Sequence, residues 1–315
     1  MRFRGKVGAA AGTIGLGLST LSLAAFFGSV WWIFDLLANF RLQGTAALLV
    51  VGALALLSSW RVPAIVTLAS AALGGIVVVP YLVGSGHGIA AGSPTIEVMS
   101  FNVGVSNPNR AAIAAFIGEE SPDVAFIFES SFEWEDTIEA ADLPLQIITK
   151  VPRGQLAGVT VLVKPVLLPR PIETGIGPEA AAISLGLGDE RIEVLGVHPP
   201  SPTTAVRAAA RDRIMAAATD WVKARAGEVV VVGDFNATPW SHPFRTLRGG
   251  AHLVDTLAGS GFQPSWPSGW GPLMVPIDHV LHTEGLGSED RHTGPAFSSA
   301  HRPVLVTIGE AAPGG

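Results

Sequence analysis

The chain contains no cysteine. A disulfide framework and a zinc site built from thiolates are therefore excluded, while a location on either side of a membrane stays open. Charged residues are also scarce, at 15% of the 315 residues, whereas hydrophobic residues make up 48%. Together with a mean hydropathy of +0.43, this excess is greater than an ordinary soluble protein carries.

The few charges are distributed unevenly along the chain. Residues 1–94 carry five basic side chains and one acidic one, Asp35, which leaves 15 basic and 25 acidic residues from Thr95 onward. The split indicates a membrane part joined to an acidic soluble part. Because binding to a nucleic acid backbone depends on Lys and Arg, we expect no nucleic acid partner, with a surface nuclease kept as an alternative.

Three apolar runs before residue 84 are long enough to cross a bilayer, which needs about 20 residues. They cover residues 7–34, 44–60 and 63–83. Arg2, Arg4, Lys6 and Arg61 flank one side of the predicted spans and Arg41 the other, so we expect a cytoplasmic N-terminus and an extracytoplasmic soluble part in the cell membrane. No charged residue lies within the runs, which favours an anchor over a transport path.

The predicted organisation has four parts. They are a three-helix membrane anchor (1–83), a short flexible linker (84–94), a folded domain (95–309) and a tail (310–315). In the domain we expect strands at residues 96–102, 124–129, 158–164, 180–187, 191–198, 229–233, 277–281 and 303–308, and helices at 109–120 and 203–223. We predict an α/β (α+β) fold, in which two packed mixed β-sheets flanked by helices form a four-layer sandwich.

The second helix has apolar residues at helical spacing, which predicts its buried face. They are Val206, Ala210, Ile214, Ala217 and Trp221.

Polar residues stand at the ends of the expected strands, where side chains from neighbouring strands converge. They are Asn102, Glu129, His198, Asp234, Asn236, Asp278 and His301. Asp234 and Asn236 follow the apolar run VVVV and Gly233, and an Asx turn that serves only the backbone is an equal alternative for this pair. Carboxylates and amides suit Mg²⁺, and imidazoles suit proton transfer, so the set predicts metal-assisted hydrolysis of a phosphate ester.

Six blocks in this order resemble the endonuclease/exonuclease/phosphatase superfamily, which includes DNase I-like nucleases, sphingomyelinases and inositol polyphosphate phosphatases. The blocks are SFNVGVSN, PDVAFIFES, GVHPP, VVVGDFNATPW, PIDHVL and SSAHRPV. Three spans followed by such a domain also resemble a group of actinobacterial membrane proteins that includes a teicoplanin-resistance factor.

The resemblance implies a role for each residue. Glu129 would be the principal ligand of Mg²⁺, with Asn102 beside it, and Mn²⁺ or Ca²⁺ are alternative ions. Asp234 would orient the attacking water, and Asn236 would hold that water or a phosphate oxygen. His301 would stabilise the pentacovalent phosphorane or transfer a proton. Asp278 would fix the tautomer of His301, and His198 would contact the phosphate from the opposite side.

The chain departs from the family pattern at two positions. Phe128 replaces the usual Gln before the metal-binding Glu, and Ala300 replaces the Asp of a Ser-Asp-His block. Loss of that carboxylate is expected to weaken metal binding. Three explanations are open: an engineered inactivating substitution, a natural variant in which Glu289 or Asp290 substitutes, and a natural protein without catalysis. The first is favoured because every other block is intact.

The remaining histidines and tryptophans have plainer interpretations. His279 alternates to the other face of its strand and is expected to be structural, and five histidines are assigned to the surface by default: His87, His242, His252, His282 and His292. Trp240, Trp266 and Trp270 are expected to pack or to line a rim. The loop of residues 263–274 is a candidate for contact with lipid, because it combines aromatic residues with a position beside a membrane.

These observations predict a membrane-embedded, extracytoplasmic, Mg²⁺-dependent phosphoesterase. Its substrate would be a phospholipid or a polyprenyl phosphate or pyrophosphate, and Ala300 leaves its activity in question. The alternatives are a surface nuclease and a binding protein that uses the same fold without catalysis.

Overall fold

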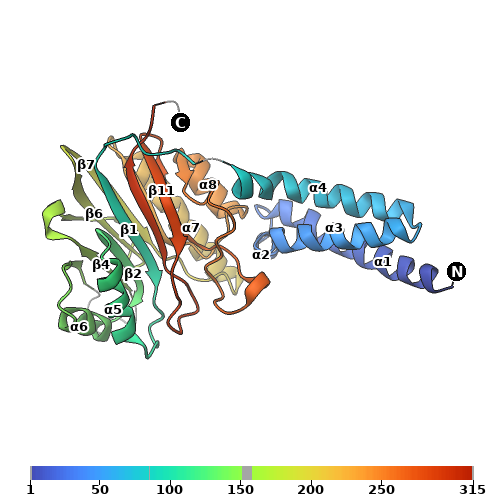
Figure 1. The fold of residues 1–315 in the computed structure, drawn as a ribbon, viewed down its shortest axis with the longest axis horizontal. Coiled ribbons are helices and arrows are strands. Elements are labelled where there is room, and N and C mark those ends of the chain that lie inside the picture. Colours follow the sequence, from blue (N-terminus) through green and yellow to red (C-terminus); the bar gives the residue numbers. More distant parts are fainter. Residues whose placement is uncertain (1, 85, 151–157, 314–315) are drawn as a thin grey trace.

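The computed structural model describes residues 2–84, 86–150 and 158–313, and for residues 2–5 the backbone only. Two parts are evident in Figure 1: a sandwich of β-sheets with helices on its outer faces, and an elongated bundle of helices that projects from one side of it. The N-terminus lies at the end of the bundle that is distant from the sandwich.

Each sheet of the sandwich has six strands. The first has the order β11 (Leu286–Thr293), β12 (Val304–Glu310), β1 (Thr95–Asn102), β2 (Val124–Ser130), β4 (Gly158–Val163), β3 (Gln146–Thr149). The second has the order β5 (Arg170–Ile172), β6 (Ala180–Leu187), β7 (Glu190–Val197), β8 (Val229–Asp234), β10 (Asp278–Thr283), β9 (Leu253–Asp255). Both are mixed, because β1 pairs with β2 and β7 with β8 in parallel while their other pairs are antiparallel.

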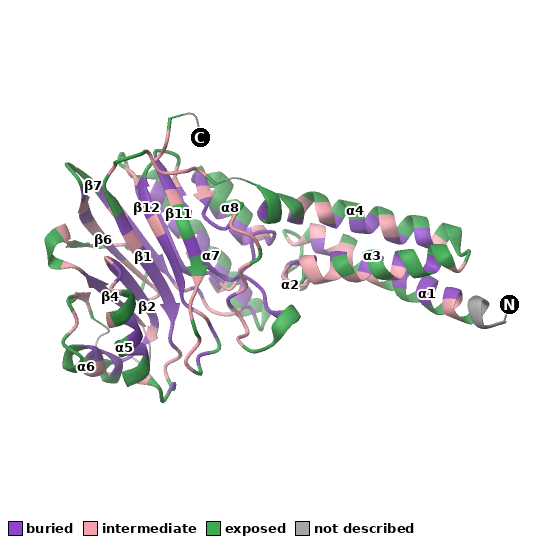
Figure 2. Ribbon diagram, in the orientation of Figure 1, coloured by how far each residue is buried: buried purple, intermediate pink, exposed green. Residues whose placement is uncertain are grey.

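The core between the sheets follows from the alternation of side chains along each strand. Val98, Phe126, Val194 and Val230 point inward from four strands and are fully buried. Each such side chain stabilises the fold by roughly 1.5–3 kcal/mol when it is buried. In Figure 2 the strands are accordingly mostly purple, with exposed residues at their ends.

Helices cover the outer face of each sheet. Helices α5 (Arg110–Glu120) and α6 (Phe132–Ala140) pack on the first sheet, and α7 (Ala205–Lys223) and α8 (His242–Gly250) on the second. The result is the predicted four-layer α/β sandwich.

The bundle consists of α1 (Arg2–Ala24), the turn η1 (Ala25–Phe27), α2 (Trp32–Ala38), α3 (Arg41–Leu57) and α4 (Arg61–Val83). Two helices, spanning Lys6–Phe27 and Arg61–Val83, are long and apolar enough to cross a membrane, and a third span is possible if α2 and α3, bent by 68°, count as one. The outward surfaces of the bundle are largely exposed, as green segments of Figure 2 indicate, and many of the exposed side chains are apolar, such as Val50, Ile65 and Ile76.

The prediction for the first span is wrong at its C-terminal end. The predicted span ran to residue 34, but the helix ends at residue 27 and Trp32 begins the separate helix α2. The sequence does not mark this break because α2 is itself apolar, although it packs on the sandwich rather than continuing the span.

The buried face predicted for α7 is right at Trp221, which is buried, but wrong at its start: Val206 is 78% exposed, while Ala208, Arg211 and Met215 are buried. The true face is displaced by one residue and contains an arginine, which a search for apolar spacing rejects. Arg211 is tolerated there because it forms an ion pair of 2.8 Å with Asp35 of α2, in which each side chain is 1% exposed.

Further bonds join α2 to the sandwich at this junction. The second carboxylate oxygen of Asp35 accepts a hydrogen bond from the backbone N–H of His242 at 2.6 Å. Asn39, which follows α2, accepts bonds from the backbone N–H and the hydroxyl of Thr238 at 3.2 and 3.1 Å. The helical bundle is therefore fixed to the loop that follows β8.

The segment predicted as a flexible linker is paired with the C-terminal strands. The backbone N–H of Ser288 donates to the carbonyl of His87 at 2.7 Å, and the N–H of Ala90 donates to the carbonyl of Glu310 at 2.8 Å. Ile89 also forms an isolated bridge with Ala311. These bonds attach residues 87–90 to the edge of the first sheet.

Several elements were not predicted: β3, β5, β9, β11, α6 and α8. The strands among them are short or polar, and β11 has the sequence LGSEDRHT with a bulge between Glu289 and His292. Regular alternation of apolar residues is absent from such segments, so pattern alone cannot identify them.

Candidate active site

Six of the seven predicted residues line one pocket of about 280 Å³ at an end of the sandwich. They are Asn102, Glu129, His198, Asp234, Asn236 and His301. The seventh, Asp278, is fully buried behind the pocket and contacts His301. The convergence arises because β1, β2, β7 and β8, which carry or precede five of these residues, all deliver their C-terminal ends to the same edge.

The exit of β8 depends on Gly233, which has a φ of +152°. A Cβ at this position would lie 1.9 Å from the carbonyl oxygen of Val197 on the neighbouring strand. The chain then turns so that Asp234 accepts a hydrogen bond from the backbone N–H of Asn236 at 2.9 Å. The turn is completed by Asn236, which has a positive φ of 49°. The two interpretations of Asp234 and Asn236 are thus compatible, because both residues form the Asx turn and both line the pocket.

Glu129 is directed by an irregularity in β2. The pairing of β2 with β4 shifts between Phe128 and Ser130, and Glu129 itself has a φ of 54°. A bulge with a residue in the left-handed region reorients the side chain relative to the rest of the strand. Its carboxylate is therefore 34% exposed in the pocket, although the residues before it are buried.

Asn102 links the two carboxylates that face the pocket. Its amide nitrogen donates to Glu129 Oε1 at 3.1 Å and to Asp234 Oδ2 at 3.0 Å, while its oxygen accepts from the N–H of Gly104 at 3.1 Å. Asn102 thus holds both acids in place, and its predicted role as a metal ligand stays a prediction.

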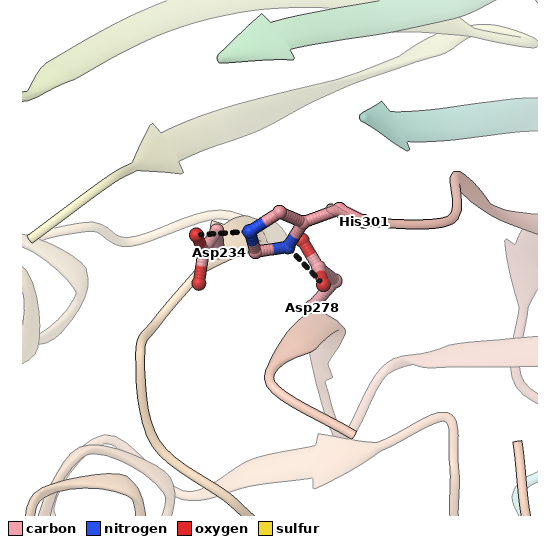
Figure 3. Close-up of side chains that lie close together, drawn as sticks. All are labelled: Asp234, Asp278 and His301. Atoms are coloured by element: carbon pink, nitrogen blue, oxygen red, sulfur yellow. Dashed lines mark hydrogen bonds and ion pairs between the residues drawn. The ribbon is translucent and has the colours of Figure 1, made fainter. Parts of the chain in front are cut away.

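His301 lies between two carboxylates, as Figure 3 shows. Its Nδ1 is 2.9 Å from Asp278 Oδ2 and its Nε2 is 3.6 Å from Asp234 Oδ2. Burial alone would lower the pKa of His301, but the charges of Asp278 and Asp234 outweigh it and raise the pKa to about 9. Without a metal, the ring is an imidazolium at neutral pH, with one N–H held by Asp278.

Charged neighbours outweigh burial at Asp234 as well, but there they lower the pKa. Burial would raise its pKa, but His301 and His198 favour the charged form and lower the pKa to about 2. His198 Nε2 lies 3.5 Å from Asp234 Oδ2 and 3.7 Å from Glu129 Oε1, and despite burial these acids raise its pKa. Phe128, which stands where the family usually has Gln, is fully buried with its ring centroid 6.0 Å from that of His198.

The site has a donor set that suits a divalent cation. Asp234, Asp278 and His301 offer ligand atoms within 4.8 Å of one another, so this cluster could hold a metal ion. Asp278 Oδ1 is buried without a hydrogen-bond partner. Glu129 adds a carboxylate, whose Oε1 lies 3.7 Å from His198 Nε2.

Ala300 lines the pocket, at the position where the resemblance implies a carboxylate. Glu289 does not replace it, because its carboxylate lies away from the pocket. Glu289 is paired in register with Thr307 in β12, which begins at Val304, whereas His301 precedes that strand. Its Oε1 accepts instead from the backbone N–H of Ile89 at 3.1 Å.

Two serines support the site and were not predicted. Ser299 Oγ donates to the carbonyl of Asn102 at 2.7 Å and accepts from the N–H of His301 at 3.0 Å. Ser265 Oγ accepts from the N–H groups of Ile277 and Asp278, at 3.2 Å each. Ser299 lies inside a conspicuous sequence block, whereas no sequence signal indicates Ser265.

The other histidine and tryptophan predictions had mixed outcomes. His282 was assigned to the surface but is fully buried, with Nδ1 2.9 Å from the carbonyl of Thr283. His279 is structural as predicted, with Nε2 2.8 Å from the carbonyl of Ala237. Trp240 packs in the core, Trp266 lines the pocket, and Trp270 is 63% exposed.

Comparison with known proteins gives one family match. A sequence model described as the Endonuclease/Exonuclease/phosphatase family matches residues 99–301. Comparison with curated proteins gave no match. The narrower resemblance to a teicoplanin-resistance factor stays a prediction.

Solved structures share the fold of the sandwich. A functionally unknown conserved protein from Enterococcus faecalis has a TM-score of 0.57 at 15% identity, over 68% of this chain and 100% of that one. TDP2 from D. rerio, complexed with single strand DNA product, has a TM-score of 0.55 at 13% identity, over 68% and 98%. An endonuclease/exonuclease/phosphatase from Bacteroides vulgatus has a TM-score of 0.54 at 15% identity, over 69% and 99%. At these identities the likeness concerns the fold alone.

Proposed function

The chain belongs to the endonuclease/exonuclease/phosphatase family, and from this premise we propose that it is a membrane-anchored phosphoesterase that hydrolyses a lipid-linked phosphate outside the cytoplasm. Members of the family are generally hydrolases of phosphoester bonds. One observation carries the choice of a lipid: the loop after Asp234 is bonded to α2, at the base of helices apolar enough to cross a membrane.

The residues of the pocket divide the work of hydrolysis in this proposal. Asp234, ionised because its pKa is about 2, accepts a hydrogen bond from the attacking water and orients it toward phosphorus. His301, protonated and held by Asp278, donates a hydrogen bond from Nε2 to a phosphoryl oxygen as negative charge develops there. Asn236 and His198 hold other oxygens of the phosphate.

Glu129 would hold a divalent cation, Mg²⁺ in the first instance, with Mn²⁺ and Ca²⁺ as alternatives. The ion would supply positive charge to the phosphate, which the described residues of the pocket provide only through histidine and Arg207. Asn102 would keep the Glu129 carboxylate in place through its 3.1 Å bond.

A nuclease is the second candidate because of the family. The charges at the pocket argue against it: among the described lining residues Arg207 is the one Lys or Arg, and its Nε donates to the carbonyl of Ser201 at 2.8 Å. A nucleic acid backbone would need several such cations.

The experiment uses full-length protein in lipid nanodiscs with Mg²⁺, and compares the chain that carries Ala300 with the variant Ala300→Asp. Substrates are phosphatidic acid, a polyprenyl pyrophosphate and single- and double-stranded DNA, and the release of phosphate, headgroup or nucleotide is measured. We expect hydrolysis of a lipid substrate, faster with Ala300→Asp because a carboxylate returns beside the pocket, and loss of about 10²–10⁴-fold with His301→Gln.

The outcomes separate the candidates. Release from DNA alone would replace the proposal with the nuclease. If no substrate is hydrolysed by either form, the proposed function is wrong, and the alternative is a binding protein on the same fold.

A further inference from the structure

We infer that the apolar chain of the substrate lies in a second cavity, formed where α2 and α3 meet the sandwich, while its phosphate occupies the catalytic pocket. This inference rests on the proposed function and deepens it by assigning a site for the chain. The cavity has a volume of about 250 Å³.

The walls of this chain cavity are mainly apolar and come from both parts of the molecule. Leu36 and Phe40 belong to the bundle, and Val275, Ile277 and Trp266 belong to the sandwich. The cavity therefore exists only while the two parts are docked.

The chain cavity and the catalytic pocket adjoin each other. Ser201, Asn236 and Trp266 line both spaces. One end of the combined space carries Glu129 and the acids around His301, and the other carries aliphatic and aromatic side chains. A ligand that fits both ends has a phosphate at one end and an apolar chain at the other.

The chain cavity also continues toward the part of the molecule that faces lipid. Phe40, 46% exposed at the bend between α2 and α3, lines it and a further cavity of about 160 Å³ among the helices. Leu18, Leu21 and Leu37 line that further cavity. In this inference a chain leaving the bilayer beside α1 and α3 passes Phe40, the residue that both cavities share; Ser22 and Arg41 add polar groups to the lining of the further cavity.

Hydrogen bonds join the two parts of the molecule around this space. Asn39, which lines the chain cavity, bonds to Thr238, and Gln43 of α3 donates to the carbonyls of Pro272 and Met274 at 3.1 and 2.9 Å. The second contact holds the end of the 263–274 loop against α3, with Trp270 and Leu273 exposed at 63% and 49%.

Binding can be tested without catalysis, so the measurement does not depend on turnover by the chain that carries Ala300. Full-length protein in phosphatidylcholine nanodiscs receives a small fraction of phosphatidic acid that carries a diazirine in one acyl chain. After photolysis, mass spectrometry locates the labelled peptides. The control probe is diacylglycerol with the same diazirine chain, which lacks the phosphate.

We expect the phosphatidic acid probe to label residues around Leu36, Phe40 and Val275–Ile277 in preference to the outer surfaces of α1 and α4, and the control probe to lose that preference. Leu36→Trp fills the cavity. Because each buried methylene contributes about fourfold in affinity, exclusion of two or more lowers this labelling by over tenfold. Leu49→Trp, the same change at an exposed site on α3, leaves the labelling unchanged.

A second measurement needs no variant. Hexyl, octyl, decyl and dodecyl phosphate compete with the probe, and we expect the competing concentration to fall about fourfold per methylene until the chain cavity is full. Equal potency across the series, or labelling spread evenly over the outer helix surfaces with both probes, would overturn the inference. If lipids are hydrolysed but this labelling is not seen, the chain cavity is wrong and the proposed function stands. If the labelling is seen but no lipid is hydrolysed, the proposed reaction is wrong and the chain cavity stands.

Discussion

Single residues with unusual backbone geometry set the shape of the site. Gly233 brings β8 so close to β7 that no side chain fits, and Glu129 reaches the pocket from a strand whose neighbouring residues are buried. These two positions direct the acids Asp234 and Glu129 toward each other, with Asn102 between them.

Substitution of Gly233 by alanine is expected to be severely destabilising. The added Cβ would overlap the carbonyl oxygen of Val197, at 1.9 Å, and would hold a φ of +152° that side chains avoid. We expect a loss of about 3 kcal/mol or more in the free energy of unfolding. Gly227→Ala is the matched control, because its Cβ meets nothing within 4 Å. Denaturant unfolding in detergent micelles checks both, and equal stability of the two variants would contradict the argument.

His279 gives the fold a dependence on pH. Burial lowers its pKa to about 3, whereas in the unfolded chain its pKa has the ordinary value of 6.5. The unfolded state therefore binds the proton first, and stability is lost as the pH falls below 6.5. From pH 7 to pH 5 this residue alone should remove about 2 kcal/mol from the free energy of unfolding.

The test is His279→Phe, whose ring fits between Phe235 and Phe244, at centroid distances of 5.2 and 4.6 Å from the present imidazole. The variant leaves the Ala237 carbonyl without its partner, which lowers stability at every pH. The difference from the parent protein should nevertheless shrink by about 2 kcal/mol from pH 7 to pH 5. A constant difference would show that His279 does not titrate as stated.

The residues of the site were largely predictable because chemistry restricts which side chains stand at strand ends. Asp234, Glu129 and His301 are conspicuous after apolar runs. Ser265 and Arg211 were missed because their roles depend on partners far away in the sequence, such as Asp35, 176 residues from Arg211.

At the scale of elements, α2 connects the two parts of the molecule. It has seven residues, yet its Asp35 contacts both Arg211 of α7 and the first residue of α8. Arg211 Nη1 also donates to the carbonyl of Asn236 at 3.3 Å, so α2 is linked to the site through one intermediate side chain.

Breaking this pair is expected to be costly. Arg211→Met leaves the Asp35 carboxylate buried without its partner and should lower stability by about 3–5 kcal/mol. Asp35→Asn combined with Arg211→Met should lose less than the sum of the single changes, by about 1 kcal/mol or more, because the pair acts together. A double-variant cycle by thermal unfolding in micelles measures this, and strict additivity would contradict it.

Strands with a regular apolar pattern were predicted nearly to the residue, as β6 shows, because that pattern lies within the sequence of the strand itself. The polar strand β11 and the helix α7 were missed or misread for the opposite reason. Their burial depends on neighbours such as the 87–90 segment and α2, which come from distant parts of the chain.

At the scale of the whole molecule, the bundle places the turn between α3 and α4 far from the sandwich (Figure 1). If the bundle crosses the membrane with the sandwich outside, the sandwich and the α3–α4 turn lie on opposite sides of the membrane. The absence of native cysteine allows each of the two to be labelled through one introduced thiol.

We expect Leu168→Cys, an exposed position on the sandwich, to react with a membrane-impermeant maleimide on intact cells. Ser59→Cys, exposed in the α3–α4 turn, should react only after the membrane is permeabilised. The reverse pattern would place the sandwich in the cytoplasm, and reaction at both positions on intact cells would contradict a membrane-spanning bundle.

The attachment of residues 87–90 to β11 and β12, together with the docking of α2, limits which lipids the sandwich can contact. A catalytic head on a loose tether could sample a neighbouring vesicle, whereas, if the bundle is embedded as proposed, this sandwich would be held close to its own bilayer by these contacts. For a lipid substrate, encounters are then confined to two dimensions. Turnover would follow the mole fraction of substrate in the surrounding leaflet rather than its bulk concentration, and a molecule in one vesicle would leave the lipids of another untouched.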